Sequence, residues 1–125
     1  MAESEQSAVD IATAVRSGAT TARTQVEAAL ARLEERNLEV NAFTTIRRDE
    51  AMAEADALDA GGVGHDGLLA GVPVAVKEEY DVTGTVTTLG GCGNSTPKIR
   101  DSEAIRRLRA AGAIIIGKTT MPEFG

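Results

Sequence analysis

Lys77 is the residue of this chain that is best placed for chemistry, because it closes the most apolar segment, residues 67–77 (GLLAGVPVAVK). A lysine so placed can lose part of its hydration, which favours the neutral amine and makes it a potential base for a partner hydroxyl. Strand alternation puts Glu79 on the face of Lys77 and Glu78 on the other, so a salt bridge between Lys77 and Glu79 competes. Local sequence alone favours a solvated strand end.

The other reactive residue types are isolated in the sequence. Residues 91–93 supply a G-x-G, but the third glycine of a dinucleotide fingerprint is missing, so nucleotide binding is a minor alternative. Cys92 has no histidine near it, and His65, the single histidine, has no second histidine with which to share a metal. Ser95 reads as a turn residue and Ser102 as part of a helix start. We therefore expect no cofactor and no metal site.

The composition suggests part of a larger protein. The chain has the length of one ordinary domain, 125 residues, but contains only two Phe, one Tyr and no Trp. The side chains of Ala, Val, Ile and Leu each bury little apolar area. Since burial stabilises a fold by ~25 cal/mol per Å² of apolar surface, a core built from them contributes little stability. Such a core is thin for this length, which favours a piece of something larger.

The charge distribution, the single cysteine and the absence of targeting signals argue against several classes of protein. Residues 1–66 hold 13 acidic and 6 basic side chains, and no basic stripe follows, which argues against nucleic-acid binding. The single cysteine, Cys92, excludes an internal disulfide framework and fits a reducing compartment. The first ten residues lack the features of a signal peptide, and no apolar run approaches the ~20 residues that span a bilayer. We expect a cytoplasmic protein that binds neither nucleic acid nor membrane.

Periodicity in residues 1–66 predicts a helical arm with one short strand. We expect a helix over 7–17 that ends at Gly18, a second from Thr20 or Thr21 to Asn37, a strand over 40–46 and a helix through 51–58. The glycine-rich residues 61–67 (GGVGHDG) predict a junction between this arm and an α/β body.

The predicted α/β body covers residues 67–125. We expect a strand over 69–77, with Pro73 at a sheet edge, a short strand over 85–89 and a loop over 90–97. A helix capped by Asp101 and a buried strand over 113–116 follow. Strand, helix and strand make a crossover unit between parallel strands.

Three segments of the second half carry a family resemblance. They are residues 69–82 (LAGVPVAVKEEYDV), Thr87-Thr88 and residues 101–125 (DSEAIRRLRAAGAIIIGKTTMPEFG). In this order they resemble the N-terminal part of an amidase-signature enzyme, a group of C–N hydrolases that includes bacterial amidases and the amidase subunit of tRNA-dependent amidotransferases. Residues 12–37, followed by VNAF at 40–43, resemble the paired helices and strand with which such enzymes begin. The resemblance covers nearly the whole chain.

The resemblance implies an α/β fold with a mixed sheet and a catalytic triad of two serines and a lysine. Lys77 occupies the position of the family lysine, and Met121 is a weaker substrate-binding candidate. Glu78 stands where the family often has Asp, and the serine- and glycine-rich segment that gives the family its name is absent. We therefore expect an incomplete fold that is inactive alone and acts on a small amide when completed.

Two interpretations remain open from the sequence. The chain is the N-terminal part of an amidase, as a truncated product, a fragment or one segment of a split enzyme completed by another chain. Alternatively, it is a non-catalytic module whose helical arm, residues 7–37, docks on a partner or on a second copy. The second hypothesis depends on the apolar stripe of the second helix staying uncovered in a short chain.

Overall fold

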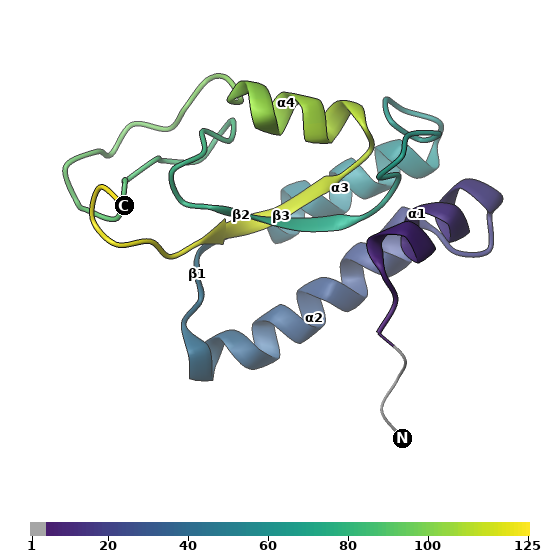
Figure 1. Ribbon diagram of the computed structural model, residues 1–125, viewed down its shortest axis with the longest axis horizontal. Helices are drawn as coiled ribbons and strands as arrows, with labels where there is room; N and C mark the ends of the chain where they lie inside the picture. Colours follow the sequence, from purple (N-terminus) through teal and green to yellow (C-terminus); the bar gives the residue numbers. More distant parts are fainter. Residues whose placement is uncertain (1–4) are drawn as a thin grey trace.

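The computed structural model describes residues 5–125, which form four helices and a three-stranded sheet (Figure 1). Along the chain these are α1 (Ala8–Ser17), α2 (Ala22–Val40), β1 (Phe43–Ile46), α3 (Arg48–Asp59), β2 (Pro73–Lys77), α4 (Glu103–Ala110) and β3 (Ile114–Thr119). This is the α/β architecture that the sequence predicted.

The strands form a mixed sheet in the order β1-β3-β2. The central strand, β3, runs antiparallel to β1 and parallel to β2. Its first half is the apolar run that predicted a buried strand, and its last residue is Thr119, three residues beyond the predicted end. As an edge strand, β2 tolerates Pro73, as expected. The connection between the parallel strands runs through α4, as the crossover prediction requires.

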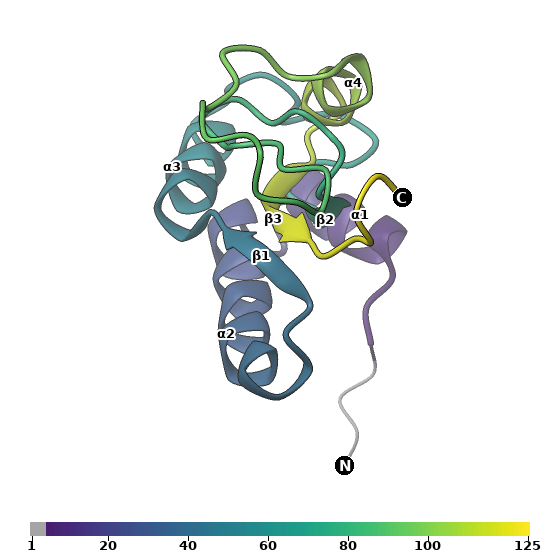
Figure 2. The ribbon, with the colours of Figure 1, turned by 90° about the vertical axis from the view of Figure 1, so that its left-hand side faces the viewer.

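Alternation along β3 divides the core between the two faces of the sheet. Ile114 and Ile116 pack with α2 and α3, whereas Ile115 packs with Val76 of β2 and Ile105 of α4. Figure 2 shows α4 on one side of the sheet and α2 and α3 on the other. The sheet thus carries helices on both faces.

Local signals fix the ends of the first two helices. Ser7 and Asp10 form a capping box at the start of α1, and Gly18 ends that helix in the left-handed conformation with φ 79°. Thr21 caps α2 through a hydrogen bond from the amide of Thr24. The predicted end of α2 at Asn37 was too early, because the left-handed cap is Asn41, with φ 48°.

The segment between β2 and α4 differs most from the prediction. Residues 85–89 do not form a strand, and a single bridge pairs Val86 with Pro97. Asp101 does not cap α4, because Ser102 takes that position. The Asp101 carboxylate instead accepts a hydrogen bond from the amide of Thr83 at 2.8 Å and lies 2.8 Å from Arg109 Nε. Long-range partners thus override the local capping signal.

The apolar stripe of α2 is covered within the chain. Its five members, Ala22, Val26, Ala29, Leu30 and Leu33, are all buried, and they pack against α3 and the β3 residues Ile114 and Ile116. The expectation that a short chain leaves this stripe open was wrong. The division at residues 61–67 stays a prediction, and strand β1 of the arm pairs with β3 of the body.

Candidate active site

The carboxyl ends of the two parallel strands meet at one edge of the sheet. Lys77, the last residue of β2, is the register partner of Thr119, the last residue of β3. Ligands of open α/β sheets bind outside the carboxyl ends of parallel strands. A functional site is therefore expected at this edge of the sheet.

The Lys77 side chain points away from the core at this edge. Its side chain is 43% exposed, and its Nζ lies 3.4 Å from Glu79 Oε1. The predicted alternation is confirmed, since Glu79 lies on the side of Lys77 and Glu78 is buried. Both sequence interpretations remain compatible with this geometry: Lys77 forms the surface ion pair, and it also remains accessible to a partner hydroxyl.

Glu78 is the first functional candidate that the sequence reasoning missed. Its side chain is 1% exposed, and its Oε2 accepts a hydrogen bond from the hydroxyl of Thr44 in β1 at 2.7 Å. Its Oε1 accepts from the amide and the hydroxyl of Thr88, at 2.9 and 3.1 Å. Burial alone would raise the pKa of this carboxyl, but these hydrogen bonds and the charge of Lys118 outweigh it and hold the pKa below its ordinary value.

Lys118 is the second missed residue, and it is fully buried. Its Nζ lies 3.5 Å from Glu78 Oε1 and donates to Val86 O and Thr87 Oγ1 at 3.2 Å each. Burial lowers the pKa of the Lys118 ammonium, and the Glu78 carboxylate offsets only part of this effect. The protein thus holds two opposite charges in its interior, beside the end of β2.

A bulge explains why the sequence pattern did not reveal Lys118. Ile115 faces α4, so regular alternation would turn residue 118 toward α2 and α3. The register between β2 and β3 shifts after Val74, however, and Lys118 becomes the partner of Val76, which also faces α4. A lysine that follows a continuous apolar run was the only available signal.

The other residues that the sequence singled out, Met121, Cys92 and His65, lie apart from the Glu78–Lys118 pair. Met121 is half-buried in the segment after β3, and Gly90 approaches that segment so closely that a Cβ there would lie 2.8 Å from Met121 O. The thiol of Cys92 is free and exposed. The Nδ1 of His65 lies 3.0 Å from a carbonyl oxygen of its own loop. The binding role of Met121 stays a prediction.

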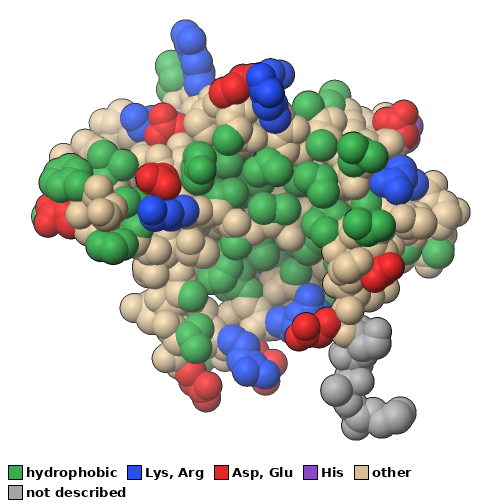
Figure 3. Space-filling model, viewed as in Figure 1, with side chains coloured by type: hydrophobic (Ala, Val, Ile, Leu, Met, Phe, Trp, Pro, Cys, Tyr) green, Lys and Arg blue, Asp and Glu red, His purple; other side chains and the backbone are tan. Residues whose placement is uncertain are grey.

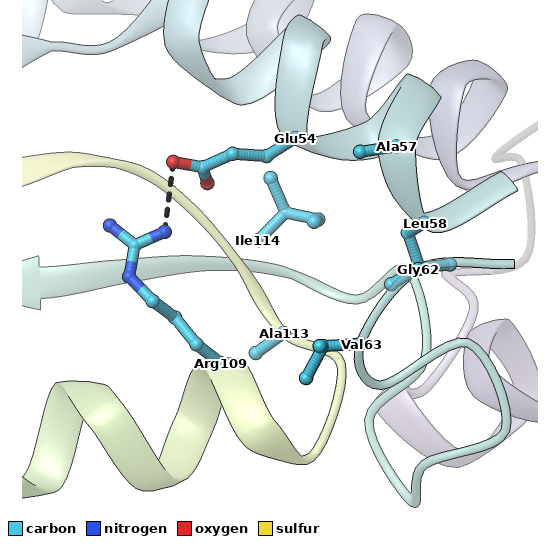
Figure 4. Close-up of a pocket in the computed structure, with 8 residues that line it drawn as sticks. All are labelled: Glu54, Ala57, Leu58, Gly62, Val63, Arg109, Ala113 and Ile114. Carbon is cyan, nitrogen blue, oxygen red and sulfur yellow. Dashed lines mark ion pairs between the residues drawn. The ribbon is translucent and has the colours of Figure 1, made fainter. Parts of the chain in front are cut away.

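A small hollow lies at the opposite end of the sheet, between α3 and α4 (Figure 4). Its volume is about 200 Å³, and Leu58, Val63 and Ile114 give it mainly apolar walls. At its rim, Arg109 Nη1 lies 2.8 Å from Glu54 Oε1. None of its lining residues is a nucleophile, and none belongs to the predicted site.

The described part of the chain shows neither a membrane span nor a metal cluster. Within residues 5–125, no helix has the length and apolar character that crossing a bilayer requires. Over this range, no three His, Cys, Asp or Glu side chains gather as metal ligands would.

Comparison with known proteins identifies the family. A family model described as Amidase matches residues 24–125. The protein named as amidase AmiB2 in Mycobacterium tuberculosis is 45% identical over 112 residues, which is 86% of this chain and 23% of that protein. A glutamyl-tRNA(Gln) amidotransferase subunit from Lacticaseibacillus paracasei is 42% identical over 112 residues, covering 88% of this chain and 23% of its own length.

Structural comparison agrees with the sequence match. The native peptide amidase from Stenotrophomonas maltophilia superposes with a TM-score of 0.85 at 26% identity, over 97% of this chain and 26% of that one. The chain therefore spans about a quarter of the length of these relatives. With the match over residues 24–125 and the shared fold, this chain belongs to the amidase-signature family and corresponds to its N-terminal part.

Proposed function

We propose that this chain supplies the lysine-bearing N-terminal part of an amide C–N hydrolase, and that Lys77 is its proton-accepting residue. The observation that carries the proposal is the position of Lys77 at the carboxyl end of β2, with 43% of its side chain exposed. A proton acceptor must be reachable by the group that it deprotonates, and this side chain is reachable.

In the proposed reaction, Lys77 works through two serines that the completing segment supplies. The nucleophilic serine loses its proton to the bridging serine as its Oγ bonds to the amide carbon, and the bridging serine passes its own hydroxyl proton to Nζ of neutral Lys77. The proton then moves to the leaving amine when the C–N bond breaks, and water releases the acyl group. Covering Lys77 with the completing segment would favour the neutral amine that this step needs.

Exposed apolar side chains on one face of the chain support the proposal that a further segment completes the fold. Apolar side chains gather across the middle of the face that carries β2 in front of β3 (Figure 3). Ala75 is exposed in the middle of β2, and Leu68, five residues before the start of that strand, is 84% exposed. The relatives that share this fold are about four times longer. We therefore propose that the chain alone is inactive and that the remainder of an amidase covers this face.

The competing docking function has lost the feature on which it depended. The α2 stripe is buried inside the chain, so it is not available to a docking partner. A complementing chain that supplies the serines remains the proposed partner.

We also propose that the protein is located in the cytoplasm. The thiol of Cys92 is free, and a free thiol fits a reducing compartment.

Fusion to a relative tests the proposal. Residues 1–125 would be joined to the part of AmiB2 that follows its matched segment, and ammonia release from a panel of small amides would be measured. We expect no turnover by the isolated chain and turnover by the fusion. Lys77→Ala in the fusion should lower kcat by about 10³-fold or more, because the members of such a triad act as a unit.

Lys98 provides a matched control for Lys77. Its side chain is 42% exposed and pairs with Asp81 at 3.7 Å, close to the 43% and 3.4 Å of the Lys77 pair. Lys98→Ala in the fusion should leave kcat within about twofold of the parent. Equal activity of the fusion and its Lys77→Ala variant would contradict the role of Lys77, and turnover by the isolated chain would contradict its inactivity.

A further inference from the structure

The residue next to Lys77 takes part in a buried charge cluster. We call it the Glu78 clamp: Glu78, Lys118 and the four threonines that contact them, Thr44, Thr85, Thr87 and Thr88. Glu78 and Lys118 are 1% and 0% exposed, respectively. No other described side chains of opposite charge in residues 5–125 pair at so low an exposure.

The carboxylate of Glu78 joins three segments that are far apart in sequence. It accepts hydrogen bonds from Thr44 in β1 and from the amide of Thr88 in the loop after β2, and it faces Lys118 of β3. The backbone amide of Glu78 also donates to Thr119 O at 2.9 Å. Both the backbone and the side chain of the residue that follows Lys77 are therefore anchored.

The ammonium of Lys118 holds the loop from the other side. It donates to Val86 O and Thr87 Oγ1 and lies 3.5 Å from Thr85 Oγ1. Three consecutive loop residues are thus tied to the end of β3. Residues 88–91 continue this loop toward the segment after β3, where the amide of Phe124 donates to Leu89 O at 2.8 Å.

Stability alone gives a weak reason for such a pair. Replacing a buried ion pair by apolar side chains of similar volume is often neutral or stabilising, because two charges must be desolvated. Buried hydrogen-bonded charges do, however, fix one geometry. Since successive strand residues point to opposite faces, anchoring Glu78 inward commits Lys77 to the outward face.

We infer that Glu78 and Lys118 are positioning residues, which hold the Lys77 backbone and the Thr85–Thr88 loop in one fixed arrangement at the carboxyl end of β2. The functional meaning of this arrangement rests on the proposed role of Lys77. The arrangement itself is measurable in the isolated chain, so the two proposals can fail separately.

Amide hydrogen exchange and ¹⁵N relaxation on the full 125-residue chain test the clamp. In Glu78→Ala we expect exchange of the Thr88 amide to rise by about tenfold or more, while the Ile115 amide in the core of β3 changes by less than about twofold. The order parameter of the Lys77 amide should fall from about 0.85, typical of rigid backbone, toward 0.6. A purely structural role would raise exchange at both sites by the same factor.

Three variants keep the test decisive. Glu79→Gln removes the neighbouring exposed carboxylate and should leave both readouts unchanged. Glu78→Asp keeps the charge and should restore most of the Thr88 protection. If Glu78→Ala does not fold, Glu78→Gln replaces it, because the amide preserves size and one acceptor, and we expect about threefold faster Thr88 exchange. Thr88 exchange and Lys77 order that match the parent chain in the folded variant would overturn the inference.

The fusion with the AmiB2 remainder adds a functional readout. There, Glu78→Ala should lower kcat by about 10²-fold with little change in KM, and Glu78→Asp should recover most of that loss. An unchanged kcat beside a selective loss of Thr88 protection would overturn the positioning role. If the parent fusion shows no turnover, the proposed function fails, and the exchange experiment still decides whether the clamp exists.

Discussion

The two ends of the sheet hold their charges in different ways. At the amino end of β3, Glu54 lies 2.8 Å from both Arg47 and Arg109, and its side chain keeps 29% exposure. At the carboxyl end, Glu78 and Lys118 have almost none. A partly exposed charge that loses its partner can turn to water, whereas a buried one cannot. We therefore expect the partly exposed pairs of Glu54 to tolerate change better than the buried pair of Glu78 and Lys118.

The largest effect should come from breaking the buried pair. Lys118→Met leaves the Glu78 carboxylate buried without its counter-charge, and we expect a loss of about 3–5 kcal/mol in the free energy of unfolding. The double variant Glu78→Gln with Lys118→Met should recover most of this loss, because no buried charge remains. Urea unfolding followed by circular dichroism measures both.

The amino end supplies the control for that prediction. Glu54→Gln removes a carboxylate with two arginine partners, and we expect a loss of no more than about 2 kcal/mol. Glu54 itself is 29% exposed, the buried Arg47 keeps its hydrogen bond to Ile115 O, and Arg109 keeps its pair with Asp101. Equal losses in Glu54→Gln and Lys118→Met would show that burial does not distinguish the two ends.

Close backbone packing also limits the volume that can be added at the amino end of β3. Gly112 has φ 97°, and a Cβ there would lie 2.3 Å from Gly64 O, which is a backbone atom. Gly112→Ala should therefore lower the unfolding free energy by about 2–3 kcal/mol. Gly18→Ala is the matched control: with φ 79° and no atom within 4 Å of the added Cβ, it should cost only about 1 kcal/mol. Thermal unfolding that gave equal losses would contradict the close approach of Gly64 and Gly112.

Lowering the pH should reduce the stability that ionised Glu78 contributes at the carboxyl end of the sheet, and with it the difference in stability contribution between the two ends. Burial would raise the pKa of Glu78, but hydrogen bonds and Lys118 lower it below its ordinary 4.5 in the folded chain. Its ionisation therefore adds stability above pH 4.5, and this contribution disappears as the pH falls from 4.5 through the folded-state pKa. The Tm gap between the parent chain and Glu78→Gln should shrink over that range.

An exposed carboxylate serves as the control for the titration. Hydrogen bonds from Arg106 and Arg107 lower the pKa of Glu103 to about 2, so this carboxylate on the surface of α4 follows the same direction of pH dependence. Because water screens its exposed pairs, Glu103→Gln should lower the Tm at pH 7 by less than Glu78→Gln does. A Tm gap for Glu78→Gln that stayed constant below pH 4.5 would contradict the assignment.

The smallest effect on stability should come from Lys77 itself. Its pair with Glu79 is about 42% exposed on both sides, and such pairs contribute about 0–1 kcal/mol. Lys77→Ala should change the unfolding free energy by less than about 0.5 kcal/mol, as should Lys98→Ala. A large loss in Lys77→Ala alone would show that Lys77 supports the fold rather than chemistry.

Elements with local signals were predictable from the sequence. Ser7 and Thr21 cap the starts of α1 and α2, because their side chains accept hydrogen bonds from amides of the first turn. Gly18 ends α1 in a conformation that glycine adopts easily. The buried strand β3 was visible as a continuous apolar run. Lys77 was identified by its motif, and the structure places it at the strand end that the sequence indicated.

Elements that depend on distant partners were not predictable. Residues 85–89 have strand-like composition, but in the structure they are held as a loop by Lys118 and Glu78. Asp101 has the side chain of a helix cap, yet Thr83 and Arg109 take its oxygens. In both cases contacts across 8 or more residues outweigh a local preference, and no periodicity encodes such contacts.

The sequence by itself determined the helices, the central strand, the family and the position of Lys77, because caps, periodicity and a contiguous motif act over a few residues. Only the tertiary structure decided that Glu78 and Lys118 meet in the interior. That meeting requires the bulge between β2 and β3, which turns Lys118 toward α4, and the packing of the Thr85–Thr88 loop against it. A one-residue shift of register changes the face of a side chain without changing the sequence pattern, so the buried charges appear only once the strands are paired.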